Sequence, residues 1–171
     1  KSTQKITKAM KMVAAAKLRK AQESAEKGRP YSEKMQNIIL NLTQSINDPE
    51  NTPKLLAGTG KDEVYLCVVM TADRGLCGGF NSNIFKKSTE LANSIYNDSD
   101  VSFVAIGKKG NDFLQKSFNV ESNHIDIFDN LNMENVSLIA ESLMEMFINE
   151  DFDKIDIVYN KFKNAATQVV V

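Results

Sequence analysis

The sequence has 171 residues, of which 42% are hydrophobic, and this is enough apolar material to exclude wholesale disorder and to fill the core of one domain. The net charge of −1 hides an asymmetry, because residues 1–29 hold nine Lys or Arg against two Glu, a local balance of +7. The remaining 142 residues therefore carry −8, so a basic segment precedes an acidic body. Such a segment usually meets an acidic partner or simply stays solvated.

Cysteine content and hydropathy restrict the compartment. Cys67 and Cys77 lie ten residues apart, which fits neither a disulfide framework nor a zinc site and favours a reducing compartment. No run of 18 apolar residues and no signal-peptide pattern is present, so we expect membrane association only through partners. The first residue is Lys1, inside a helical pattern, and "QVVV" at the other end has a strand pattern, so we expect both ends to be cut.

The N-terminal segment predicts a long helix. From Ser2 to Lys27 there is no Gly or Pro, and apolar residues recur every three or four positions: Ile6, Met10, Val13, Ala14, Leu18, Ala21 and Ala25. Pro30 removes a backbone donor, yet the spacing resumes from Tyr31 to Ile46, so one kinked helix competes with two separate helices. We expect this helical unit over residues 1–50 and a linker over 51–61, where proline and glycine gather.

Residues 62–171 predict an α/β domain. The apolar run Val64–Met70 is typical of a strand buried on both faces, and further strands are expected at 101–106, 124–128 and 154–162. Between them lie helical patterns at 82–96, 108–118 and 133–149, with Asn81 as a possible cap of the first. The inward residues expected on the last helix are Val136, Ile139, Ala140, Leu143 and Phe147. Alternating strands and helices predict a mainly parallel sheet, a Rossmann-like arrangement.

The stretch "MTADRGLCGGFNSN", Met70–Asn83, has three glycines at a strand-to-helix junction, where a phosphate loop would lie. Its spacing, G-x-x-G-G, differs from the dinucleotide fingerprint, and Gly60-Lys61 lacks the other elements of a P-loop. These failures favour glycines that permit tight turns. Asp73 and Arg74 would then pair locally or contact a partner.

Other catalytic chemistry has little support. His124 is the only histidine, so neither a catalytic triad nor a two-histidine metal site can be assembled, and Cys77 has no base assigned to it. We expect no catalytic, metal or cofactor site in this chain. Nucleic-acid binding by the basic helix lacks the aromatic residues that stack on bases, whereas Ala14, Ala15 and Ala16 suit a tight coiled-coil seam.

Two segments resemble one family closely. "TQKITKAMKMVAAAKLRKAQ", Thr3–Gln22, is similar to the N-terminal helix of the gamma subunit of F-type ATP synthases, and "TADRGLCGGFNSNIFK", Thr71–Lys86, is similar to the glycine motif of that family. "RPY", "IGKKG" and "YNKFKNAATQV" also match in order. The resemblance covers essentially the whole chain.

The resemblance implies a rotor shaft that binds no nucleotide itself, in which the long helix forms half of an antiparallel coiled coil with a C-terminal helix absent from these 171 residues. The implied partners are the alpha and beta subunits, the epsilon subunit and the c-subunit ring, on the cytoplasmic face of a bacterial inner membrane or on the mitochondrial matrix face. A nucleotide-binding or nucleic-acid-binding domain with a basic arm is the alternative. The contact residues expected are Ile6, Lys8, Met10, Lys11, Val13, Leu18, Arg19, Asp73 and Arg74.

Overall fold

The computed structural model describes residues 2–46, 48, 51–96, 100–164 and 167–171. The chain divides into two compact units, Lys1–Thr52 and Pro53–Val171, and each is described by itself. The first unit is dominated by one helix, and the second holds all the strands.

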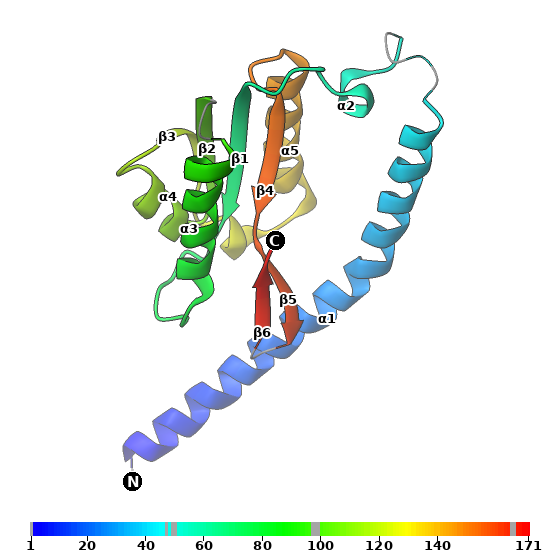
Figure 1. Cartoon of the computed structure of the whole chain (residues 1–171). Coiled ribbons are helices and arrows are strands. Elements are labelled where there is room, and N and C mark those ends of the chain that lie inside the picture. The colour runs from blue at the N-terminus through cyan, green and yellow to red at the C-terminus, as the bar shows by residue number, and fades with distance from the viewer. Residues whose placement is uncertain (1, 47, 49–50, 97–99, 165–166) are drawn as a thin grey trace. The chain divides into compact units, whose positions relative to one another are not determined.

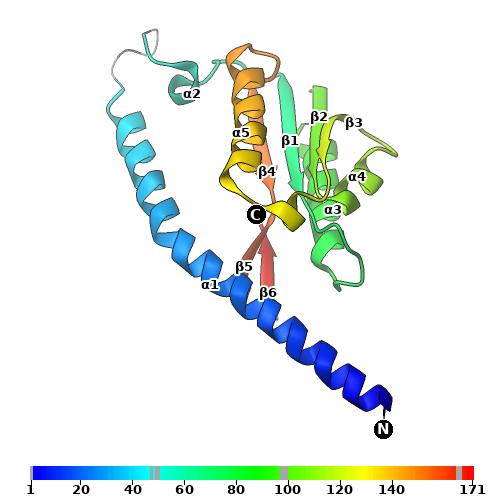
Figure 2. The same cartoon turned by 180° about the vertical axis from the view of Figure 1, so that it is seen from behind.

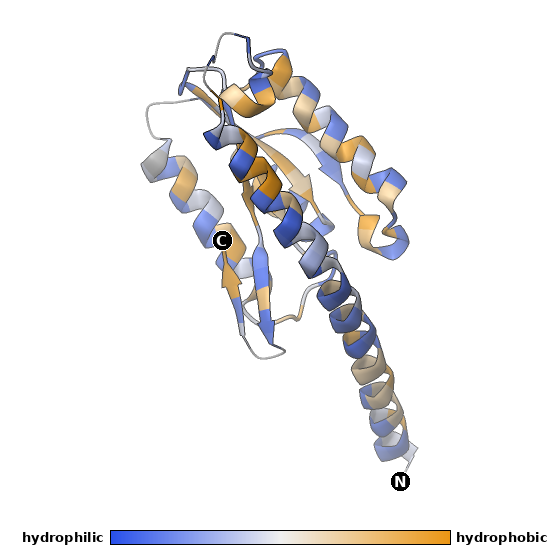
Figure 3. Ribbon diagram, turned by 90° about the vertical axis from the view of Figure 1, so that its right-hand side faces the viewer, coloured by the Kyte–Doolittle hydropathy of each residue, from blue (hydrophilic) through white to orange (hydrophobic). Residues whose placement is uncertain are grey.

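Helix α1, Ser2–Gln44, runs without interruption through Pro30, so the kinked single helix is correct and the pair of separate helices is wrong. Figure 1 shows that α1 changes direction in its middle, as expected where proline removes a helical hydrogen bond. No residue of α1 is buried. Figure 3 shows apolar residues recurring among polar ones along α1. Because none of its residues is buried, the apolar side chains of α1 are not covered by other residues of the first unit.

A four-stranded parallel sheet forms the centre of the second unit and confirms the α/β prediction. Its order is β3-β2-β1-β4, with β1 at Val64–Met70, β2 at Asp100–Ile106, β3 at Asn119–His124 and β4 at Lys154–Val158. The five residues Tyr65–Val69 of β1 are buried because strands flank β1 and helices cover both faces (Figure 1). The apolar run therefore predicted a central strand correctly.

Helices cover both faces of the sheet (Figures 1 and 2), and an apolar cluster lies under each layer of helices. Helices α3, Phe80–Glu90, and α4, Lys108–Leu114, cover one face, where Ile84 and Leu114 pack with Cys67 and Phe103. Helix α5, Met133–Ile148, covers the other, where Ile139 packs with Leu66 and Val104. Because β1 and β4 are parallel neighbours, their carboxyl ends lie side by side at the same end of the sheet.

The third strand was predicted at His124–Phe128 and lies earlier, at Asn119–His124. Residue Asp126 has a left-handed backbone, φ +60°, which ends the extended conformation, and Ile127–Asn130 form a 3₁₀ turn instead. The sequence pattern failed because β3 is an outer strand, whose residues "NVESNH" are largely polar and alternate between exposed and half-buried.

The strand predicted at Lys154–Phe162 is two strands. After β4 ends at Val158, strand β5, Asn160–Asn164, pairs antiparallel with β6, Thr167–Val170, in a separate two-stranded sheet. Tyr159 and Val171 exchange two backbone hydrogen bonds of 2.9 Å beside this hairpin. The alternating pattern does not break where the chain passes from one sheet to the other, so it could not show the change.

The predicted cap of α3 is wrong, and the predicted inward face of α5 is correct at Ile139 and Leu143 but wrong at Val136 and Ala140. The cap of α3 is Gly79 and the helix begins at Phe80, while a π-helical turn, Leu91–Ile95, follows the last α-helical residue. On α5 the residues that pack on the sheet are Ile139, Leu143 and Met146, and the expected inward residues Val136 and Ala140 are exposed. The observed and predicted faces of α5 share Ile139 and Leu143, so the buried face is rotated about the helix axis by less than the angle between consecutive residues.

Part of the segment interpreted as a linker is ordered on the domain. Residues Lys54–Ala57 form a one-turn helix, α2, that contacts α5. Lys54 Nζ donates to the carbonyl of Ile148 at 3.0 Å and pairs with Glu150 at 2.6 Å, and Lys61 Nζ pairs with Glu150 at 2.7 Å. Through these two ion pairs, Glu150 holds the first residues of the second unit against the end of α5.

Candidate functional site

The glycine loop is anchored by Asn81, which had been predicted as a helix cap. The Asn81 side chain is buried, accepts a 3.0 Å hydrogen bond from the amide of Ala72 and donates to the carbonyl of Arg74 at 3.3 Å and to Cys77 Sγ at 3.3 Å. Gly78 has φ +61°, a conformation that glycine adopts without strain. The backbone of the loop is therefore a tight turn fixed from inside by one side chain.

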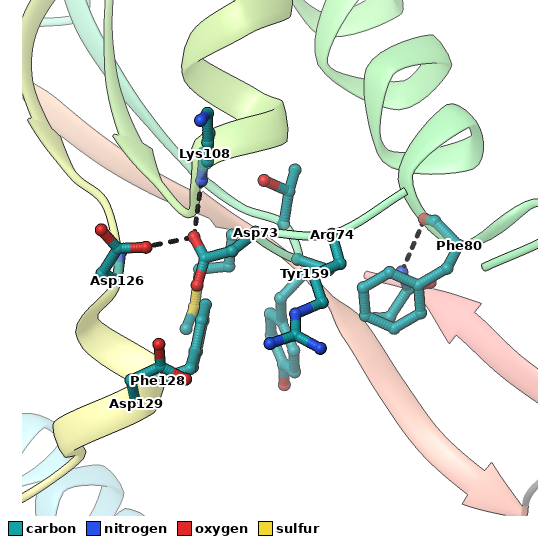
Figure 4. A pocket seen from close by; sticks show the side chains of 12 residues that line it. Asp73, Arg74, Phe80, Lys108, Asp126, Phe128, Asp129 and Tyr159 are labelled. Atoms are coloured by element: carbon teal, nitrogen blue, oxygen red, sulfur yellow. Dashed lines mark hydrogen bonds between the residues drawn. The ribbon is translucent and has the colours of Figure 1, made fainter. Parts of the chain in front are cut away.

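Asp73 joins three strand ends. Its Oδ1 accepts hydrogen bonds from the amide of Lys108 at 2.8 Å and from that of Asp126 at 3.4 Å, as Figure 4 shows. These amides follow β2 and β3, while Asp73 itself follows β1. The predicted contact residue Asp73 thus has a local structural role, and a partner contact through it stays a prediction.

Thr71 and two glycines of "IGKKG" form a close junction between β1 and α4. Gly107 has φ +98°, and a Cβ there would overlap the backbone carbonyl of Thr71. The amide of Gly110 donates a 2.7 Å hydrogen bond to Thr71 Oγ1. Any side chain at Gly107 would push the end of β2 away from the end of β1, which explains in physical terms why glycine is present at this position.

These strand ends surround a pocket of about 680 Å³. The pocket lies where the strand order reverses between β1 and β4, the position at which open α/β sheets usually hold ligands. Its walls are aromatic and charged (Figure 4), formed by Met70, Thr71, Ala72, Asp73, Arg74, Phe80, Lys108, Asp126, Phe128, Asp129, Tyr159 and Asn160. Asn160 Nδ2 donates to the carbonyl of Phe80 at 2.9 Å and so closes one side.

The sequence predicted only Asp73 and Arg74 among these pocket residues. Phe80, Phe128, Tyr159 and Asn160 were missed because their segments were assigned to the wrong elements. The available signal was that ligand sites in parallel sheets lie at the carboxyl ends of neighbouring strands. The misplaced ends of β3 and β4 hid that signal.

The other seven predicted contact residues lie on α1 and are exposed. The apolar ones, Ile6, Met10, Val13 and Leu18, are between 43% and 68% exposed. Lys8 and Lys11 are exposed, and Arg19 forms a 2.9 Å ion pair with Glu23 one turn later. The structure therefore does not gather all nine predicted residues at one site, since seven belong to the first unit and two to the second.

Burial shifts the pKa values of a histidine and a cysteine of the second unit. Burial lowers the pKa of His124, whose Nε2 lies 3.4 Å from Ser122 Oγ. Burial also raises the pKa of Cys67 to about 12, so this thiol is inert at neutral pH, whereas Cys77 is exposed. Among the described residues, no group of three or more His, Cys, Asp or Glu is placed to hold a metal ion. No helix in the described ranges has the length and apolar character needed to cross a bilayer.

Comparisons with known proteins assign the family. Residues 1–171 match the family described as ATP synthase. The chain is 53% identical to the ATP synthase gamma chain of Pelagibacter ubique and 44% identical to that of Rhizobium etli, over 99% of this chain and 60% and 59% of theirs. The chain thus spans about three fifths of the length of these relatives.

A solved structure agrees in fold and sequence. A chain in the central stalk and c-ring structure of the Tetrahymena thermophila mitochondrial ATP synthase superposes with a TM-score of 0.75 at 30% identity, over 97% of this chain and 70% of that one. A rotor chain of the Euglena gracilis mitochondrial enzyme, at 19% identity and a TM-score of 0.50, shares the fold. The family match over residues 1–171 and the similarity over 99% of this chain together place it in the gamma-chain family of ATP synthase.

Proposed function

We propose that this chain is part of the central rotor shaft of an ATP synthase, which couples rotation of the membrane ring to conformational changes at the catalytic subunits. The observation that carries the proposal is α1, a helix of 43 residues with none buried. A helix that long would measure about 65 Å at 1.5 Å per residue, far more than the core of a small domain needs. Such a helix suits a shaft gripped by neighbouring subunits.

The chain acts by contact and performs no chemical step itself. Rotation presents different faces of an asymmetric shaft to each beta subunit, and contacts that differ between beta conformations shift their populations. Two features support this assignment: the glycine loop departs from both nucleotide-binding patterns, and its loop glycines serve a turn anchored by Asn81.

The proposed partners follow from the family. The alpha and beta subunits would surround α1, the epsilon subunit and the c ring would contact the α/β domain, and a C-terminal helix of the complete gamma chain would pair with α1. The relatives at 53% and 44% identity are bacterial, which supports a place on the cytoplasmic face of a bacterial inner membrane, held there through the complex. The mitochondrial matrix face is the alternative.

Three kinds of contact are proposed for the predicted residues. Ile6, Met10, Val13 and Leu18 would pack in the coiled coil or its sleeve, because exposed apolar side chains gain free energy when covered. Lys8, Lys11 and Arg19 would steer acidic loops of the beta subunits. Asp73 and Arg74 would contact a partner from the edge of the α/β domain.

The steering contacts are tested in a chimera that joins this chain to the remaining part of the Pelagibacter ubique gamma chain, reconstituted with alpha, beta and membrane subunits. Neutralising Lys8, Lys11 and Arg19 to Gln should lower ATP synthesis relative to hydrolysis. The melting temperature of the chain should stay within about 2 °C, because the three side chains are exposed.

The matched control neutralises Lys20, Lys27 and Lys34, which are exposed on the same helix and outside the assigned set. The control complex should keep the synthesis-to-hydrolysis ratio of the unmodified chimera. Equal ratios for the unmodified chimera and for the Lys8, Lys11 and Arg19 variant would contradict the steering role.

A further inference from the structure

The pocket at the carboxyl ends of β1 and β4 is lined by Arg74, whose guanidinium has no ion-pair partner among the described residues. Arg74 is exposed. Its backbone carbonyl is held by Asn81 Nδ2. The side chain therefore extends from a fixed point, and Figure 4 shows it reaching into the space between Phe128 and Phe80.

The neighbouring carboxylate does not neutralise Arg74. Asp73 Oδ1 accepts the amides of Lys108 and Asp126, so this oxygen is directed toward the ends of β2 and β3. A planar guanidinium with free donors is suited to a carboxylate, which it can bind through two parallel hydrogen bonds. The free cation therefore selects an anionic group.

The walls select the rest of the ligand. Phe80, Phe128 and Tyr159 line a space of about 680 Å³, within the range of cavities that hold small organic ligands. Aromatic walls favour a flat apolar body, which gains from both burial and ring contacts. The pocket also opens where the strand order reverses between β1 and β4, which is the usual position of ligand sites in open α/β sheets.

The charges also limit how many negative groups the ligand can carry. Asp73, Asp126 and Asp129 line the pocket against only two cations, Arg74 and Lys108. A polyphosphate would meet repulsion from the carboxylates, and the glycine loop lacks the phosphate-binding spacing. A single carboxylate needs only Arg74.

We propose that the pocket between β1 and β4 binds a small aromatic monocarboxylate, with its carboxylate on Arg74 and its ring between Phe80 and Phe128. This inference does not depend on the contacts proposed for α1, because every residue it uses lies in the second unit. It gives the Arg74 side chain a small ligand in place of the partner contact proposed above. The binding site is distinct from the exposed surface of α1.

The test is a titration of the ¹⁵N-labelled 171-residue chain with 1-naphthoate, followed by NMR. We expect saturable shifts at the amides of Ala72, Arg74 and Asn160. Arg74→Gln should weaken binding by about tenfold, the cost of one charge-assisted contact. Lys86→Gln, which removes an exposed cation from α3 outside this pocket, should leave the affinity unchanged. The neutral analogue 1-naphthalenemethanol should bind about tenfold more weakly than the acid.

In the titrations with 1-naphthoate and its alcohol, any of three results would overturn the proposal. These are an affinity for 1-naphthoate that is the same in Arg74→Gln, equal affinities for the acid and the alcohol, and shifts confined to the apolar residues of α1. ATP serves as the polyphosphate comparison and should give no saturable shift in the pocket. Tighter binding of ATP than of naphthoate would replace the monocarboxylate with a nucleotide.

Discussion

The hydroxyl oxygen of Thr71 accepts a 2.7 Å hydrogen bond from the amide of Gly110, so the end of β1 is fixed to the first turns of α4. This approach requires glycine at position 107 and leaves little room for a side chain at position 110. A Cβ on Gly110 would lie 3.0 Å from Thr71 Oγ1, and one on Gly107 would lie 2.8 Å from the Thr71 carbonyl carbon. The pocket walls that follow β1 depend on this junction for their position.

Gly107→Ala should therefore destabilise the second unit by about 3 kcal/mol, since the new methyl group overlaps the Thr71 backbone and alanine disfavours φ +98°. Urea unfolding followed by circular dichroism measures the change. Gly75→Ala is the matched control, because its Cβ would meet only Lys109 Cε, at 3.8 Å, and should change the free energy of unfolding by less than about 0.5 kcal/mol. Equal losses in both variants would contradict the junction.

Asn81→Leu should loosen the glycine loop. The substitution removes the acceptor of the Ala72 amide and the donor to the Arg74 carbonyl, and a buried group left unpaired costs about 1–3 kcal/mol. Amide hydrogen exchange at Ala72 should become faster than in the unmodified chain. Ser82→Ala, one residue later and exposed, is the control and should leave that exchange rate unchanged. Unaltered exchange in Asn81→Leu would show that the loop is held by other means.

Acid should weaken the attachment of α2 to α5. Hydrogen bonds from Lys54 and then Lys61 lower the pKa of Glu150 from 4.5 to about 2. Because the folded-state pKa lies below the unfolded one, this stabilisation is complete above about pH 4.5 and disappears as the pH falls toward 2.

The stability difference between the unmodified chain and Glu150→Gln should therefore shrink over that range, measured by thermal unfolding at a series of pH values. The glutamine side chain has nearly the same size and shape as that of glutamate but carries no charge, so the comparison isolates the charge. Glu141→Gln, at an exposed position of α5, serves as the control. A difference that is independent of pH between 2 and 4.5 would argue against the two lysine pairs as its source.

The apolar side chains of α1 should make the isolated chain self-associate. Ile6 and Val13 are 57% and 58% exposed, and exposed apolar surface promotes association in water. The average mass from light scattering should rise with protein concentration. Ile6→Glu with Val13→Glu should suppress that rise, whereas Lys8→Glu with Lys11→Glu should not. A monomer at every concentration would contradict this prediction.

The central features of the fold could be predicted because single segments carried them. The run Val64–Met70 is apolar on both faces only if both faces are covered, which describes β1 in the middle of a parallel sheet. Helix α1 was predicted from its spacing and from the absence of Gly and Pro before residue 28. Both properties are local, so they could be derived without knowledge of the rest of the chain.

The parts that failed depend on contacts between distant segments. β3 is held by its pairing with β2 and has few apolar residues of its own, so periodicity placed it too late. Asn81 was expected to cap a helix because amides often do so, but its bonds to Ala72 and Arg74 form only once the loop has closed. The pocket was missed for the same reason, since its aromatic walls come from three separate segments.

The proposal that the chain is part of a rotor shaft is best tested by following the rotation of a probe attached to it. Cys77 is exposed and Cys67 is buried, so a single probe can be attached to Cys77 in the chimera with the Pelagibacter ubique gamma chain, after any cysteine supplied by that partner sequence is replaced. In a reconstituted complex fixed through its catalytic subunits, we expect the probe to rotate in one direction while ATP is hydrolysed. A complex that hydrolyses ATP while the probe stays stationary would rule out the rotor function.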